Sequence, residues 1–140
     1  MDELIEKLHS GNYSCVIACG SDVRTFSQKG VADLYDLLKN EPDFLKTASV
    51  ADKIVGKAAA ALMILGGVAK IYADMISTPA REILEQSNIK VQFGKEVSVI
   101  ENKDRTGMCP VETLVKNCST VQEILPIVEE FILNIRKNKK

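Results

Sequence analysis

The first third of the chain alternates between helical and extended patterns of hydrophobic positions. Residues 2–9 place aliphatic side chains at helical spacing among charged ones, which predicts a short amphipathic helix. The runs 13–19 and 23–27 favour strands, and the turn residues between them predict a β-hairpin. A second amphipathic helix is expected over 31–39, and Pro42 marks the loop that follows it.

The middle of the chain contains a segment with the pattern of a buried helix. Ser49 and Asp52 have the spacing of a capping box, in which two side chains bond free N–H groups at a helix start. A helix is therefore expected over 49–65, ended by Gly66-Gly67. Its charged residues all fall in the first two turns, which indicates the central helix of a layered fold with a polar N-terminal mouth. These charged residues are Asp52, Lys53 and Lys57.

The segment after the glycine pair predicts two further strands separated by a helix. An apolar run over 68–75 has the pattern of an interior strand. Thr78-Pro79 is typical of a helix start, and this helix is expected to end near Ser87. The next strand is predicted over 89–93. Residues 97–100 are either a fifth strand after a tight turn or an irregular segment.

The C-terminal third predicts a polar loop and two helices. The loop spans 102–107, and Cys109-Pro110 then opens a short helix, since proline suits the first helical position. A longer helix is expected over 120–137, and Pro126 should kink it or restart it. The basic tail 136–140 is expected to be frayed.

Together these elements predict one α/β domain over residues 1–140. A β-hairpin followed by right-handed β-α-β crossovers predicts a mixed sheet of four or five strands. Helices on both faces of this sheet would make a three-layer fold.

Composition and charge exclude several classes of protein. Lys+Arg 18 against Asp+Glu 19 gives a net charge of −1, so a general nucleic-acid binder is not expected. The longest apolar run, 58–69, is too short to span a bilayer, so no membrane partner is expected. The N-terminus is polar and acidic and lacks the pattern of a secretory signal. A soluble cytoplasmic protein is the expectation.

The inventory of catalytic and metal-binding side chains is small. His9 is the only histidine, and the cysteines at 15, 19, 109 and 118 fit zinc-site spacing poorly. Cys15 and Cys19 are expected on the same buried face of a strand, where free cysteine packs as a small hydrophobe. Neither a metal nor a cofactor is predicted.

The order of elements resembles the cytidine-deaminase-like fold. In zinc deaminases H-x-E opens the buried helix, and P-C-x-x-C opens the helix after the third strand. The corresponding segments here, 50–54 and 77–81, contain neither histidine nor cysteine. Zinc-dependent deamination is therefore not expected.

Four segments of the sequence carry a more specific resemblance: 23–27, 30–34, 50–60 and 106–112. They resemble the prokaryotic family called domain of unknown function 1893, and the resemblance extends over about residues 10–135. It implies a zinc-less, deaminase-like fold and no particular activity. This sequence has Asn102-Lys103 where the family tends to have Asn-Arg, which weakens any role for an arginine at position 103.

The mouth of the 49–65 helix and the loop before Cys109 are expected to face one cleft at the ends of the strands. Lys53 and Lys57 are four residues apart, so they would share a helix face next to free N–H groups that favour an anion. Each residue also has a purely structural interpretation. Asp52 would complete a capping box, Lys53 and Lys57 would be solvated side chains at the start of the helix, and Cys109 would only cap a helix. The candidate ligand-binding residues are Asp52, Lys53, Lys57, Arg105, Thr106 and Glu112, and the candidate nucleophile is Cys109.

Three functions remain open from the sequence. The first is a non-catalytic binding or regulatory domain whose metal-free cleft holds a nucleotide-like or phosphate-bearing small molecule. The second is an enzyme that uses Cys109 as nucleophile beside Glu112 or Asp52. The third is a scaffold that binds another protein or associates with itself as a homo-oligomer. A large apolar area exposed on the outer helices would favour the third, and a fast-reacting thiol would favour the second.

Overall fold

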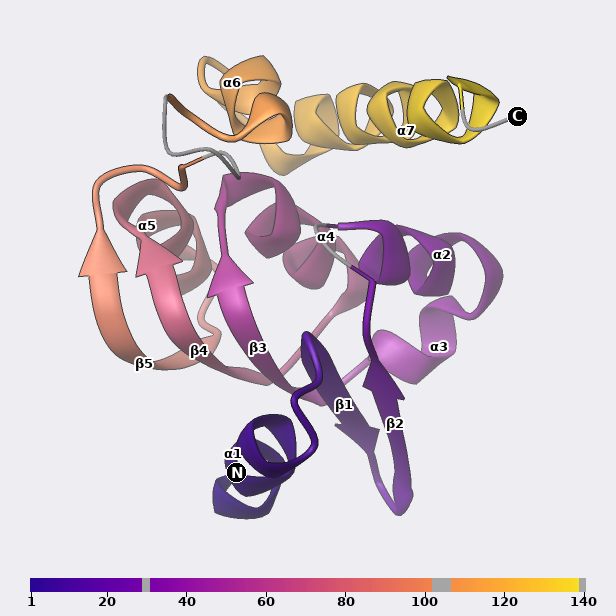
Figure 1. Cartoon of the computed structure of the whole chain (residues 1–140), viewed down its shortest axis with the longest axis vertical. Helices are drawn as coiled ribbons and strands as arrows, with labels where there is room; N and C mark the ends of the chain where they lie inside the picture. The colour runs from indigo at the N-terminus through magenta and orange to yellow at the C-terminus, as the bar shows by residue number, and fades with distance from the viewer. Residues whose placement is uncertain (29–30, 102–106, 139–140) are drawn as a thin grey trace.

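A five-stranded mixed sheet lies at the centre of the computed structural model, which describes residues 1–28, 31–101 and 107–138 (Figure 1). The order of strands across the sheet is β2-β1-β3-β4-β5. β1 is antiparallel to β2 and to β3, whereas β3, β4 and β5 are parallel to one another. The predicted hairpin and mixed sheet are therefore confirmed. The strands are β1 (Cys15–Cys19), β2 (Asp22–Phe26), β3 (Ser49–Val55), β4 (Lys70–Ser77) and β5 (Lys90–Val97).

Helices cover both faces of the sheet. On one face α1 packs Leu4 and Leu8 against Val16 and Ala51. On the other face α2, α4 and α5 enclose the main hydrophobic core, and α6 and α7 lie beyond the carboxyl ends of the parallel strands, at the top of Figure 1. The helices are α1 (Asp2–Ser10), α2 (Ala32–Asn40), α3 (Pro42–Leu45), α4 (Lys57–Gly66), α5 (Thr78–Gln86), α6 (Pro110–Val115) and α7 (Val121–Asn138).

The prediction of one helix over 49–65 is wrong in its first half. Residues 49–55 form β3, whose backbone pairs with β1 on one side and with β4 on the other. The capping box between Ser49 and Asp52 therefore does not form. The helix α4 begins only at Lys57, after Gly56. Tertiary hydrogen bonding explains the difference, because two neighbouring strands satisfy the N–H and C=O groups of β3 along its length.

This correction also changes the comparison with zinc deaminases. The segment 50–54 belongs to a central strand and opens no helix. The helix after the third strand is α4, and its first residues are Lys57-Ala58-Ala59. The segment 77–81 belongs to the start of the following helix, α5, which is capped by the Ser77 hydroxyl.

The edge strand β5 is longer than predicted. It continues from Lys90 to Val97 through Gly94-Lys95, where the sequence suggested a tight turn, so residues 97–100 form no separate strand. A Cβ atom on Gly94 would lie 3.0 Å from the carbonyl oxygen of Asp74. Glycine at this position therefore serves the close approach of two strands.

Two prolines also differ from the expectation. Pro42 opens the short helix α3 and does not mark an open loop. Pro126 lies inside α7, which continues through it as one helix, so the helix does not restart there. Arg136, in the tail predicted to fray, is helical and donates to Asp36 at 2.8 Å, while residues 139–140 lie outside the described part of the chain.

Candidate functional site

A small cleft of about 50 Å³ lies at the carboxyl ends of the parallel strands. It is bounded by the starts of α4 and α5, by the segment after β5 and by α6. Lys57 and Glu112, both predicted from the sequence as binding residues, lie here. The lining residues are Lys57, Ser77, Pro79, Ser98, Val99, Ile100, Met108, Glu112 and Lys116.

Glu112 caps the N-terminus of α4. Its Oε1 atom accepts a hydrogen bond from the Lys57 N–H at 2.7 Å, and its Oε2 atom accepts one from the Ala58 N–H at 3.0 Å. Glu112 is buried, and a carboxylate at this position also complements the positive end of the helix dipole. A Cβ atom on Gly56 would overlap the Glu112 carboxylate, which explains the glycine before the helix. An internal carboxylate thus fills the helix mouth at which the sequence predicted a bound anion.

Lys57 connects the same two helices through its side chain. Its Nζ atom donates to the carbonyl oxygen of Cys118 at 2.7 Å and to that of Lys116 at 3.1 Å. Both carbonyls follow the end of α6, where the helix dipole favours a positive charge. Lys57 and Glu112 therefore hold α6 against the start of α4.

Asp52 lies in β3, away from the cleft. It is buried opposite Cys15 of β1, and its Oδ1 atom accepts a hydrogen bond from the Ile54 N–H at 3.3 Å. Burial raises the pKa of Asp52 to about 7, although bonds from the backbone N–H groups of Ile54 and Lys53 oppose the shift. Burial, followed by the charge of Asp52, also raises the pKa of the Cys15 thiol. This pair belongs to the core, as predicted for Cys15, and it does not join Lys57.

Lys53 lies beside the opposite, α1-covered face of the sheet. Its Nζ atom donates to Oδ1 of Asn12 at 2.7 Å, in the turn after α1. Successive side chains of a strand point to opposite faces, so Asp52 and Lys53 cannot act on one ligand. The predicted pairing of Lys53 with Lys57 on one helix face is wrong, because Lys53 lies in β3 and the helix α4 begins only at Lys57.

Cys109 is the N-cap residue of α6 and is half-buried. Its N–H donates to the Ile100 carbonyl at 2.7 Å, and its own carbonyl accepts from the Thr113 hydroxyl at 3.1 Å. The carboxylate of Glu112 is already bonded to α4, so it does not serve Cys109 as a base. Arg105 and Thr106, the remaining candidates, lie outside the described residues.

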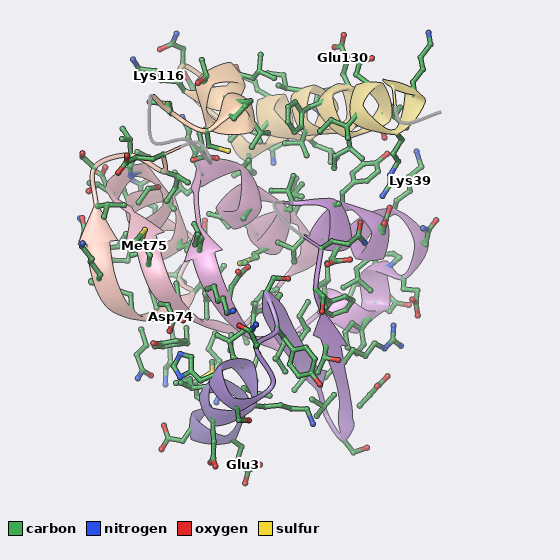
Figure 2. All side chains as sticks on the ribbon, in the orientation of Figure 1. Glu3, Lys39, Asp74, Met75, Lys116 and Glu130 are labelled. Atoms are coloured by element: carbon green, nitrogen blue, oxygen red, sulfur yellow. The ribbon has the colours of Figure 1, made fainter. Side chains whose placement is uncertain are left out.

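Sequence analysis missed a polar cluster between α1 and β4. The Tyr72 hydroxyl donates to Asp74 Oδ1 at 2.6 Å, and His9 Nε2 lies 2.7 Å from the same oxygen. Figure 2 shows Asp74 beside α1. The hydrogen bond to Asp74 raises the pKa of Tyr72 to about 12. The available signal was the polar pair Tyr72 and Asp74, two residues apart in the middle of a largely apolar strand.

The described residues contain neither a cluster of metal-binding side chains nor a helix suited to a membrane. Within residues 1–28, 31–101 and 107–138, no three His, Cys, Asp or Glu side chains lie close enough together to hold a metal ion. None of the helices in these same ranges has the length and apolar character needed to cross a membrane.

The family model for a domain of unknown function, DUF1893, matches residues 3–132. The chain belongs to the DUF1893 family. A crystal structure of a DUF1893 family protein from Thermotoga maritima is similar to it, with a TM-score of 0.85 and 26% sequence identity. That similarity covers 92% of this chain and 87% of the Thermotoga chain. A search of curated proteins found no match. The DUF1893 resemblance expected from the sequence is confirmed.

Proposed function

We propose that this DUF1893 protein is a non-catalytic binding domain that holds a small anionic group, of the phosphate class, at the carboxyl ends of β3, β4 and β5. The observation that carries the proposal is the cleft at this edge, which brings together two lysines and two serines from separate elements. They are Lys57, Lys116, Ser77 and Ser98. Open α/β sheets bind their ligands outside the carboxyl ends of the strands, which supports the choice of this edge.

The size of the cleft narrows the class of ligand. About 50 Å³ suits a single small polar group, whereas pockets that enclose a whole drug-sized molecule have roughly 300–1,000 Å³. The phosphate of a nucleotide-like metabolite would enter the cleft, and the rest of the molecule would lie outside it. This ligand falls within the nucleotide-like or phosphate-bearing class that the sequence suggested.

The charges around the cleft favour an anion. The Glu112 carboxylate accepts hydrogen bonds from two N–H groups at the start of α4, and the Ser77 hydroxyl caps α5. The Lys116 side chain is exposed, and within the part of the chain that the structure describes it forms no salt bridge. Lys116 is therefore the group that would contact the anion most directly.

A binding role has more support than catalysis by Cys109. A nucleophilic thiol needs a base within hydrogen-bond reach, and both candidate carboxylates are engaged elsewhere. Glu112 bonds the start of α4, and Asp52 lies in the core beside Cys15. The exposed Leu114 and Leu133 on the outer helices are single residues of a kind common on protein surfaces, so they favour no scaffold role.

We also infer that the fold is a metal-free relative of the deaminase-like fold. Its support is the N-terminal helix and hairpin, followed by a helix, a strand and a helix in the order expected from the resemblance. The helix after the third strand is where zinc deaminases place P-C-x-x-C. Here that helix, α4, opens with Lys57 and is capped by the carboxylate of Glu112.

The test is thermal unfolding of the full chain in the presence of inorganic phosphate and of adenosine monophosphate. Both should raise the melting temperature of the parent protein in a saturable way, because a ligand that binds only the folded state stabilises it. Lys116→Ala keeps the backbone carbonyl that Lys57 bonds and should weaken the effect at least about threefold. Lys137→Ala, an exposed lysine on α7, is the matched control and should behave like the parent. Equal weakening by both variants, or no stabilisation of the parent, would overturn the proposal.

A further inference from the structure

A larger cavity than the carboxyl-end cleft lies at the opposite end of the parallel strands. It has a volume of about 370 Å³ and is formed around the amino ends of β4 and β5. Lys70 and Lys90, the first residues of these strands, both line it. The other lining residues are Met1, Ile71, Val91 and Gln92.

Lys70 and Lys90 are direct partners in the register of β4 and β5. The next residues, Ile71 and Val91, pack in or against the main core, so the two lysines point to the opposite face of the sheet. Like charges directly opposite each other on neighbouring strands are destabilising. Across the described ranges, neither lysine forms a salt bridge that would offset the repulsion.

The face that carries the two lysines is only partly covered. α1 packs against β1 and β3, near the centre of the sheet, and its N-terminus bounds the cavity through Met1. In Figure 1, β4 and β5 lie to the left of α1, on the side of the sheet where β5 is the edge strand. The cavity therefore has a wall at α1, a floor on two strands and an open side to solvent.

We propose that this cavity binds a phosphate monoester through Lys70 and Lys90. A lysine ammonium binds phosphate as a point charge, and two adjacent ammonium groups match a group that carries close to two negative charges at pH 7. The volume lies within the range of small-molecule sites, so it leaves room for the organic part of the ester. The Gln92 amide can donate to a hydroxyl of that part. The site is independent of the carboxyl-end cleft, because it shares no residue with it.

The experiment is a titration of the ¹⁵N-labelled full chain with glycerol 3-phosphate, followed through backbone amide shifts. Saturable shifts are expected at Lys70, Ile71, Lys90 and Gln92, with a dissociation constant below about 10 mM. Shifts confined to the amides around Lys57 would support the carboxyl-end cleft alone and overturn this site. If no shifts appear at Lys70 and Lys90, this site is overturned. The proposed function at the carboxyl-end cleft is tested separately, by the Lys116→Ala variant.

Variants at the two lysines separate binding from effects on folding. The double variant Lys70→Gln with Lys90→Gln should weaken binding at least about tenfold. Lys95→Gln alters an exposed lysine of the same strand and should leave binding within about twofold of the parent. Lys90→Glu places a carboxylate opposite Lys70, which favours the folded sheet, and should also abolish binding. Equal effects of Lys95→Gln and the double variant would overturn the site.

A second titration with succinate tests the class of ligand. Succinate carries its two charges on separate carboxylates and should bind more weakly than glycerol 3-phosphate, because a phosphate monoester presents close to two charges on one group to both lysines. Succinate binding as tight as that of the phosphate ester would overturn the phosphate assignment.

Discussion

Replacing Asp52 by asparagine removes a buried charge and keeps the shape of the side chain. Asp52 is 9% exposed, and its Oδ1 atom accepts the Ile54 N–H, a bond that an asparagine oxygen can also accept. Burial is the largest cause of the raised pKa of Asp52, and the carboxylate of Asp74 raises it further. A hydrogen bond from the Cys15 thiol, which faces Asp52 across the strand pair, lowers this pKa and only partly offsets the cost of burying the charge.

The size of the effect follows from the pKa of Asp52, which burial raises from 3.8 to about 7. This difference corresponds to about 4 kcal/mol of free energy. Between pH 4 and pH 7 the folded protein holds a proton at Asp52 that the unfolded chain has released, so stability falls as the pH rises through this window. Above about pH 7 both states are ionised and this contribution becomes constant. Asp52→Asn should therefore be up to about 4 kcal/mol more stable than the parent near pH 8, and about equal to it near pH 4.

The assay is urea unfolding of parent and variant at several pH values between 4 and 8, with the free energy of unfolding extrapolated to water. Burial also raises the pKa of Asp33, but that carboxyl is present in both proteins and cancels in the difference. Asp43→Asn, at a side chain that is 89% exposed, is the matched control and should change stability by less than about 0.5 kcal/mol. A difference between Asp52→Asn and parent that is the same at every pH would refute the reasoning.

Three further predictions concern the cleft, the thiols and the metal content. Glu112→Ala should lower the free energy of unfolding, measured in urea, by about 2–4 kcal/mol, because it leaves the N–H groups of Lys57 and Ala58 without an acceptor. Glu130→Ala, on the exposed side of α7, is the control, and an equal effect of both variants would contradict the capping role of Glu112. Brief treatment with limiting iodoacetamide should label Cys109 before the other cysteines, since Cys109 is half-buried at a helix start while Cys15 is buried in the sheet. Peptide mapping that finds another cysteine labelled first would refute this order. Elemental analysis after mild chelation should find far less than one zinc per chain, and about one per chain would contradict the reasoning from missing ligands.

Several elements were predictable because their signals are local. The hairpin depends on turn residues between two strand-forming runs, and α1 and α7 depend on hydrophobic spacing within a few turns. The start of α5 was predicted from Thr78-Pro79, and the structure places the N-cap one residue earlier, at Ser77, whose hydroxyl accepts a hydrogen bond from the Ala80 N–H. Family membership likewise follows from short motifs that are visible without a structure.

The segment 49–55 shows where local signals are insufficient. The spacing of Ser49 and Asp52 is compatible with a helix start. The segment is a strand because β1 and β4 lie on either side of it and bond its backbone. β4 follows the segment only after the whole of α4, so a window of a few residues does not contain the deciding partner.

The contacts in the candidate site were also decided by tertiary structure, because the partner residues lie far apart in the sequence. The sequence by itself placed Lys57 and Glu112 among the binding residues and supplied the helices that carry them. It did not determine that the Glu112 carboxylate, 55 positions along the chain from Lys57, would cap α4 and fill the anion position. Nor did it determine that Asp74 would meet His9, 65 positions away. Helix and strand patterns follow from neighbours in the chain, whereas the partner of a buried polar group depends on which distant elements pack together.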